Sequence, residues 1–65
     1  MVKVGDTVKV TNLYYTRLHC GRESQYNIGD TFTVHDINED ERGIIISDDD
    51  YNFVHENDFQ VINNV

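Results

Sequence analysis

The chain has 65 residues, a formal net charge of −7 at pH 7, no proline, no tryptophan and one cysteine. This length allows a single small domain, which buries about 60% of the surface of its unfolded chain and leaves little room for a deep substrate cleft. No apolar run reaches the ~20 residues of a membrane span, and residues 1–6 contain no apolar signal region. We therefore expect a cytoplasmic protein that has no membrane partner.

Cys20 cannot form a disulfide within the chain, which favours a reducing compartment. It follows His19, but neighbouring residues on a strand point to opposite faces, which disfavours a nucleophile and a base acting together. The carboxylates are expected in exposed turns, where they lack the burial that tunes a general acid or base. The three histidines and Cys20 lack zinc-ligand spacing, and the acidic runs lack the alternating acids of an EF-hand loop. We predict no enzyme activity, no metal and no cofactor.

Charge is divided unevenly along the chain. Residues 1–22 carry four basic side chains and one acid, a net of +3, whereas residues 23–65 carry one arginine and eleven acids, a net of −10. The acidic total repels nucleic acid on average, and the basic N-terminal third is the exception.

Strand-favouring residues recur in five short runs, which either alternate apolar and polar side chains or are apolar throughout. In chain order, these runs predict strands at residues 7–11, 31–35, 43–47, 51–54 and 59–62. No window shows the apolar spacing of an amphipathic helix. The inward-facing side chains predict a core of Val8, Val10, Phe32, Val34, Ile44, Ile46, Phe53, Phe59 and Val61.

Turn-forming residues separate the predicted strands. Residues 38–43 end in Gly43, which can take a positive φ, and residues 48–50 are three aspartates that fit a tight hairpin loop. Residues 56–58 fit one turn of 3₁₀ helix before the last strand. The remaining connection, residues 12–27, is long for a compact domain, and loops of this length are usually functional or disordered.

One pattern occurs twice. It consists of an aliphatic residue, Gly-Asp-Thr, an apolar residue, a polar residue and valine, at residues 4–10 and 28–34. Two copies, 24 residues apart, are too few for a solenoid. We interpret them as one turn geometry that is used twice to begin two strands.

These elements follow the plan of an SH3-like barrel, with five short strands, a long first loop, tight hairpins and a 3₁₀ turn before the last strand. The two Gly-Asp-Thr segments and the closing His55-Glu56-Asn57-Asp58-Phe59-Gln60-Val61-Ile62 resemble the small SH3-like proteins of bacteriophages over nearly the whole chain. The resemblance implies an all-β fold, a small five-stranded SH3-like barrel, more firmly than it implies an activity. It also implies a phage protein that acts in the host cytoplasm.

The long loop holds the residues best suited to a protein interface, because tyrosine and arginine are enriched at interface hot spots and loops on a rigid scaffold often bind partners. Leu13-Tyr14-Tyr15 resembles the aromatic start of the corresponding loop in peptide-binding SH3 domains, although this chain lacks the tryptophan of their grooves. An SH3-like fold would bring the 56–58 turn near this loop. We therefore predict a surface that binds a host protein through Tyr14, Tyr15, Arg17, His19, Arg22, Tyr26, His55 and Asn57.

Two alternatives remain open. The aromatic and basic side chains of residues 12–27 could stack on bases and meet phosphates, although the net charge disfavours nucleic acid. The acidic runs at residues 39–41 and 48–50 could instead mimic DNA phosphates and occupy a basic groove on a host enzyme. The simplest interpretation of those runs is that they are solvated hairpin turns.

Overall fold

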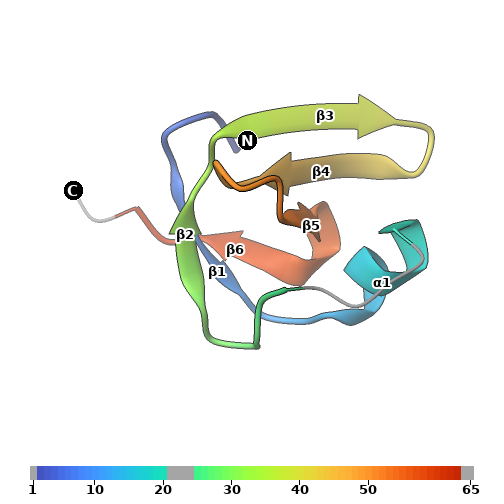
Figure 1. Cartoon of the computed structure of the whole chain (residues 1–65), viewed down its shortest axis with the longest axis horizontal. Coiled ribbons are helices and arrows are strands. Elements are labelled where there is room, and N and C mark those ends of the chain that lie inside the picture. The colour runs from blue at the N-terminus through green and yellow to red at the C-terminus, as the bar shows by residue number, and fades with distance from the viewer. Residues whose placement is uncertain (1, 21–24, 64–65) are drawn as a thin grey trace.

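Two antiparallel sheets and one short helix make up the described part of the chain (Figure 1). The computed structural model describes residues 2–20 and 25–63, with only the backbone of Cys20 included. In chain order the elements are β1 (Thr7–Val10), α1 (Tyr14–Cys20), β2 (Thr31–Thr33), β3 (Asp36–Asp40), β4 (Gly43–Ser47), β5 (Phe53–His55), the 3₁₀ helix η1 (Glu56–Asp58) and β6 (Phe59–Val61). One sheet has the strand order β2-β1-β6 and the other has the order β3-β4-β5.

The β3–β4 hairpin brings its turn close to the helix. In Figure 1 this hairpin runs across the direction of β1 and β2, and its turn lies on the same side of the molecule as α1.

Within the described ranges, no helix has the length and hydrophobicity to cross a membrane.

The expected all-β class is confirmed only in its coarse form. The described residues are mostly β, but α1 occupies the first part of what we expected to be a loop. Those residues form six strands instead of five, and the two sheets do not close into a barrel.

The extra strand arises because residues 31–35 leave one sheet for the other. The Val34 N–H donates to Asp6 O (2.8 Å), just before β1, whereas the His35 N–H donates to Ser47 O (2.8 Å), at the end of β4. The backbone therefore changes sheets between these two residues, and the expected single strand becomes β2 and β3.

The expected turn at residues 38–43 is mostly strand. β3 extends to Asp40, which pairs with Gly43, so only residues 41–42 form the turn. Ile37 is the one half-buried side chain of β3, and the other four are exposed and polar. The segment therefore lacks the alternation of apolar and polar residues by which a strand is predicted from sequence. β3 is an edge strand, where charged side chains discourage pairing with another chain.

Among the described residues, five buried aliphatic side chains form the core. They are Val8, Val10, Val34, Ile46 and Val54, and all but Val54 belong to the predicted set. Four further members of that set are half-buried: Phe32, Ile44, Phe53 and Phe59. The prediction for Val61 is wrong, since 38% of its surface is exposed. Val61 lies opposite Val8, but β6 is at the edge of its sheet, so a neighbouring strand covers Val61 on one side only.

The two Gly-Asp-Thr segments form matching turns, as the sequence repeat predicts. Gly5 and Gly29 have φ angles of 96° and 99°, which glycine adopts without strain. The strands that follow, β1 and β2, pair antiparallel. Each turn is hydrogen-bonded to the far end of the other strand, from Gly5 N–H to Val34 O (2.9 Å) and from Gly29 N–H to Val10 O (2.8 Å). The repeat therefore builds a strand pair with approximate two-fold symmetry.

Asp48 organises the β4–β5 turn from within and is buried, unlike the solvated loop expected for the aspartate run. Its carboxylate accepts hydrogen bonds from the Asp50 N–H, the Asn52 N–H and Asn52 Nδ2 (2.9 Å each), and from Tyr26 Oη. Burial alone would raise the pKa of Asp48, but these hydrogen bonds outweigh it and hold the pKa below its ordinary value. Asp49 and Asp50 are exposed, as expected.

Changing Asp48 to Asn should lower the free energy of unfolding by about 1–3 kcal/mol at pH 7, because charge-assisted hydrogen bonds are weakened. The pKa of Asp48 in the folded state lies below the unfolded value of about 3.9. The ionised carboxylate therefore stabilises the fold above that value, and its contribution is lost as the pH falls through the folded-state pKa. In urea unfolding, the deficit of Asp48→Asn should shrink between about pH 5 and pH 2.

The matched control is Asp49→Asn, at the exposed neighbouring position. This variant should change stability by no more than about 0.5 kcal/mol at either pH. A deficit of Asp48→Asn that does not depend on pH would contradict the structural role assigned to the carboxylate.

Candidate functional site

The first turn of α1 is capped by one local and one distant side chain. Asn12 Oδ1 accepts a hydrogen bond from the Leu13 N–H (2.8 Å). Asp58, from η1, accepts from the Tyr15 N–H (3.3 Å) and the Thr16 N–H (2.6 Å). The first N–H groups of a helix have no partner within the helix and need such acceptors. The position of α1 therefore depends on a carboxylate from the opposite end of the chain.

Thr16 joins the helix to the strand beside it. Its hydroxyl donates to Asp58 Oδ2 (2.6 Å) and accepts from the His55 N–H (2.9 Å). Thr16 and Asp58 are 2% and 0% exposed, so water cannot replace these bonds. The contact fixes α1 against β5 and η1, and it places the rings of Tyr15 and His19 within 6 Å of the His55 ring, at 5.7 and 5.8 Å between centroids.

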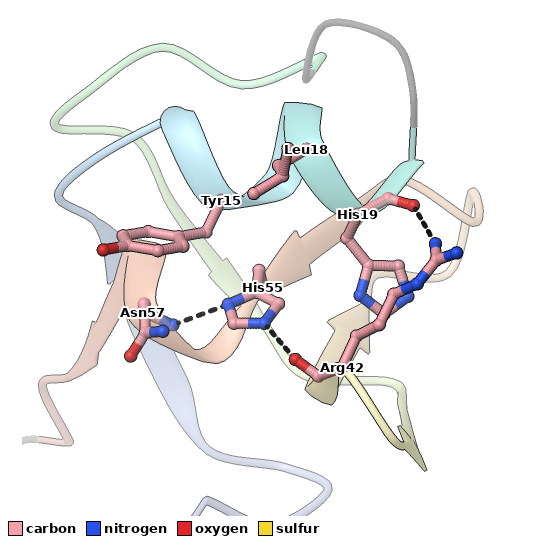
Figure 2. Close-up of a pocket in the computed structure, with 6 residues that line it drawn as sticks. All are labelled: Tyr15, Leu18, His19, Arg42, His55 and Asn57. Atoms are coloured by element: carbon pink, nitrogen blue, oxygen red, sulfur yellow. Dashed lines mark hydrogen bonds between the residues drawn. The ribbon is translucent and has the colours of Figure 1, made fainter.

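A cleft of about 490 Å³ opens between α1, the β3–β4 turn and η1 (Figure 2). It is lined by Tyr15, Leu18, His19, Arg42, His55 and Asn57. Figure 2 shows Tyr15 and His19 extending from α1 toward His55. Tyr15 and Leu18 are 39% and 66% exposed, so the mouth of the cleft is accessible and largely apolar.

His55 forms the floor of the cleft and is only 5% exposed. Its Nδ1 accepts a hydrogen bond from the Asn57 N–H (3.1 Å), so the ring hydrogen is on Nε2, which donates to Arg42 O (3.0 Å). The Tyr15 ring stacks on the imidazole with an angle of 25° between the planes. Both ring nitrogens are therefore used to hold the β3–β4 turn and η1 in place.

His19 and Arg42 close the other end of the cleft. Arg42 Nη1 donates to His19 O (3.1 Å), which satisfies a carbonyl in the last turn of α1. His19 Nε2 lies 3.4 Å from Asp40 Oδ2, and the His19 side chain is 10% exposed. His19 Nδ1 is buried, and among the described residues it has no hydrogen-bond partner.

Gly43 is required where β4 passes beneath the cleft. Its φ of +119° confirms the positive value expected from the sequence. A Cβ at this position would lie 2.6 Å from Glu56 Oε1 and 3.0 Å from His55 Nε2. The missing side chain therefore lets both the His55 ring and the Glu56 side chain approach the start of β4.

Half of the predicted interface residues line the cleft, namely Tyr15, His19, His55 and Asn57. Tyr14 is 61% exposed beside it, and its ring meets the Tyr15 ring edge-on at 5.1 Å between centroids. The expected proximity of the first loop and the 56–58 turn is therefore present in the structure. Arg22 lies outside the described residues.

Two predicted residues are placed elsewhere. Arg17 is exposed and follows Tyr15 by two positions, about 200° around the helix, so it projects away from the cleft. Tyr26 stacks on Phe32 at 4.5 Å between centroids, and its hydroxyl donates to Asp48. Burial, together with that carboxylate, raises the pKa of Tyr26 above its ordinary value. Tyr26 therefore supports the fold instead of the cleft.

Two residues of the cleft, Leu18 and Arg42, are absent from the sequence prediction. Leu18 follows Tyr15 by three positions, which is one face of a helix, and Asn12 is a favoured N-cap residue. Reading these two signals together would have predicted α1 and its exposed face. Arg42 has no comparable signal, because the path of the β3–β4 turn alone brings it to the cleft.

Neither a metal cluster nor a relative guides the interpretation of this site. In the described part of the chain, no group of three or more His, Cys, Asp or Glu side chains is arranged to hold a metal ion. The chain matches no protein-family model, and comparisons with curated proteins and with solved structures gave no match. The chemistry of the cleft is therefore the basis for any functional assignment.

Changing Thr16 to Val removes one hydroxyl and keeps the shape of the side chain. The His55 N–H then loses its acceptor and Asp58 loses one donor, so the free energy of unfolding should fall by about 1–3 kcal/mol in urea. Thr31→Val, at an exposed position of β2, changes the same atoms and should have an effect of no more than about 0.5 kcal/mol. Equal effects of the two changes would contradict the role of Thr16.

Proposed function

We propose that this chain is a non-enzymatic binding module that holds a segment of a partner protein in the cleft between α1, the β3–β4 turn and η1. The observation that carries the proposal is the exposed patch at the mouth of this cleft, formed by Tyr14, Tyr15 and Leu18. Single exposed apolar residues are common, but neighbours beside a concave surface are typical of interaction sites. Tyrosine is also among the residues that contribute most to interfaces.

The proposal includes the SH3-like plan and a host protein as partner. β2 and β3 follow each other directly, and counting them as one bent strand shared by both sheets leaves five strands. The 3₁₀ helix η1 precedes the last strand, at the position that the resemblance to phage SH3-like proteins implies. The same resemblance supports a protein of the host cell as the partner.

The hydrogen bonds of His55 favour binding over catalysis. A general base needs a ring nitrogen directed at a substrate or nucleophile. Both nitrogens of His55 are instead hydrogen-bonded to the backbone of the β3–β4 turn and η1. This histidine therefore supports the shape of the cleft.

The charges around the cleft favour a protein over nucleic acid. Arg17 projects away from the cleft, and Arg42 Nη1 is hydrogen-bonded to the end of α1. The carboxylate of Asp40 lies beside His19. An acid at this position repels phosphates, and nucleic-acid binding depends on neutralising several of them.

The test begins with affinity purification of the tagged chain from host lysate, and mass spectrometry identifies the protein that is captured. The double change Tyr15→Ala and Leu18→Ala should then weaken capture of that protein at least tenfold, because it removes the exposed anchors of the cleft. Calorimetric titration measures the affinity, and circular dichroism checks that the variant is folded.

The matched control is Tyr51→Ala with Ile28→Ala, which removes one exposed aromatic and one exposed aliphatic side chain outside the cleft. This control should bind as the parent does. Neutralising Glu39, Asp40 and Glu41 to Gln or Asn should weaken binding only moderately, mainly through the association rate. If these acids prove indispensable and the Tyr15 and Leu18 changes have no effect, mimicry of DNA phosphates replaces the proposal.

A further inference from the structure

The short helix η1 is capped by a histidine ring. Its N-cap residue is His55, whose Nδ1 accepts a hydrogen bond from the Asn57 N–H (3.1 Å; Figure 2). N-cap residues are usually Ser, Thr, Asp or Asn, which accept through an oxygen. An imidazole nitrogen is different, because imidazoles take up a second proton between about pH 7 and pH 5. A cap of this kind can change in a pH range where an oxygen cap does not.

A second proton on the His55 ring has only one place to go. Nε2 already carries the ring hydrogen and donates it to Arg42 O (3.0 Å). The proton therefore adds to Nδ1, which turns the acceptor of the Asn57 N–H into a donor. The contact with η1 is then lost, whereas the contact with the β3–β4 turn remains. Because the residue is only 5% exposed, little water is available to replace the lost bond.

Charged and titratable groups lie near the His55 ring on the elements packed around it. They are Tyr15 and His19 of α1, Asp40 of β3, Arg42 of the β3–β4 turn, and Glu56 and Asp58 of η1. β4 has no titratable side chain. The arginine and a protonated His19 oppose a positive charge on the ring, whereas the carboxylates and the face of the tyrosine ring favour it. Charge alone therefore does not exclude the proton.

None of the three carboxylates is placed to replace the lost bond. The Asp58 carboxylate already accepts from the Tyr15 N–H and from the N–H and hydroxyl of Thr16. Asp40 lies at His19 Nε2, at a distance of 3.4 Å. The Glu56 side chain approaches the start of β4, where the nearest atom of the His55 ring is Nε2. The effect of the proton therefore falls on the bond between Nδ1 and the Asn57 N–H.

We propose that His55 is a pH-sensitive cap of η1, and that a proton at its Nδ1 releases the Asn57 N–H and loosens the wall of the cleft to which Asn57 belongs. The cap is complete while the ring is neutral, and it is lost as the pH falls from about 7 toward 5. α1 is capped by amide and carboxylate oxygens instead, so acidification over this range should act on η1. Because Asn57 lines the cleft, acidification should also release a bound partner, a consequence that rests on the proposed function.

The test uses the whole chain labelled with nitrogen-15 and needs no partner. Proton–nitrogen correlation spectra report the protonation of the His55 ring and the amide of Asn57 in steps from about pH 7.5 to about pH 5. We expect the ring to gain its proton in this range and the Asn57 amide shift to follow the same curve. Hydrogen-exchange protection of the Asn57 amide should fall at least about fivefold, the factor that corresponds to one net hydrogen bond. Protection of the Thr16 amide, which donates to Asp58, should change less than about twofold.

Variants at the three histidines assign the response. His55→Asn keeps a favoured N-cap side chain and removes the ring, so the Asn57 amide should become insensitive to pH. His19→Gln removes the neighbouring imidazole and should leave the response of Asn57 unchanged. His35→Gln, at an exposed position outside the cleft, is the matched control and should behave as the parent does. The amides of β1 and β2 show whether each variant is folded, and the titration of the parent chain does not depend on the folding of any variant.

The outcomes distinguish this inference from the proposed function. If the His55 ring gains its proton while the Asn57 amide keeps its shift and its protection, the cap does not depend on the ring and the inference is overturned. A ring that stays neutral at about pH 5, or a response that disappears in His19→Gln, overturns it as well. The capture experiment with Tyr15 and Leu18 decides the proposed function separately, so either can fail without the other.

Discussion

The carboxylate of Asp58 is the contact on which the rest of the site depends. It is fully buried and accepts hydrogen bonds from the Tyr15 N–H, the Thr16 N–H and the Thr16 hydroxyl. The backbone carbonyl of the same residue accepts from the Thr11 N–H (2.8 Å) and the Asn12 N–H (3.3 Å). A buried charge is stable only where such donors surround it. One residue of η1 therefore determines both where α1 begins and which way it faces.

The cleft follows from this contact and from the missing side chain at Gly43. Once Thr16 is fixed against β5, Tyr15 and His19 lie next to the His55 ring. Because Gly43 has no side chain, His55 Nε2 can reach the Arg42 carbonyl in the β3–β4 turn. The same turn brings the Arg42 side chain to the end of α1, where it donates to His19 O. Secondary structure elements from both halves of the chain thus build a single concave surface, and their polar groups are mostly used to hold it together.

Sequence reasoning predicts five of the six strands in the described residues and misses β3 and the helix, for physical reasons. Alternating side chains reveal β1 and the apolar run reveals β4, because one face or both faces of those strands are buried. α1 has seven residues, about two turns, and the side chain that it buries most deeply is the polar Thr16 instead of an apolar stripe. Its second cap comes from Asp58, a distant residue that no local pattern indicates. Tyr15, His19, His55 and Asn57 could be predicted as interface candidates from residue type, whereas Arg42 depends on the path of the β3–β4 turn.

The central claim is that Asp58 and Thr16 hold α1 against β5 and η1. Native-state hydrogen exchange tests this claim most directly. The Thr16 and His55 amides donate to buried side-chain oxygens and should open only in the global unfolding that also exposes the β4 amides paired with β3. Their opening free energies should therefore match those of the β4 amides and fall equally as denaturant is added. Exchange of the Thr16 and His55 amides at the rate of exposed amides, while β4 stays protected, would contradict the claim and remove the basis for the cleft.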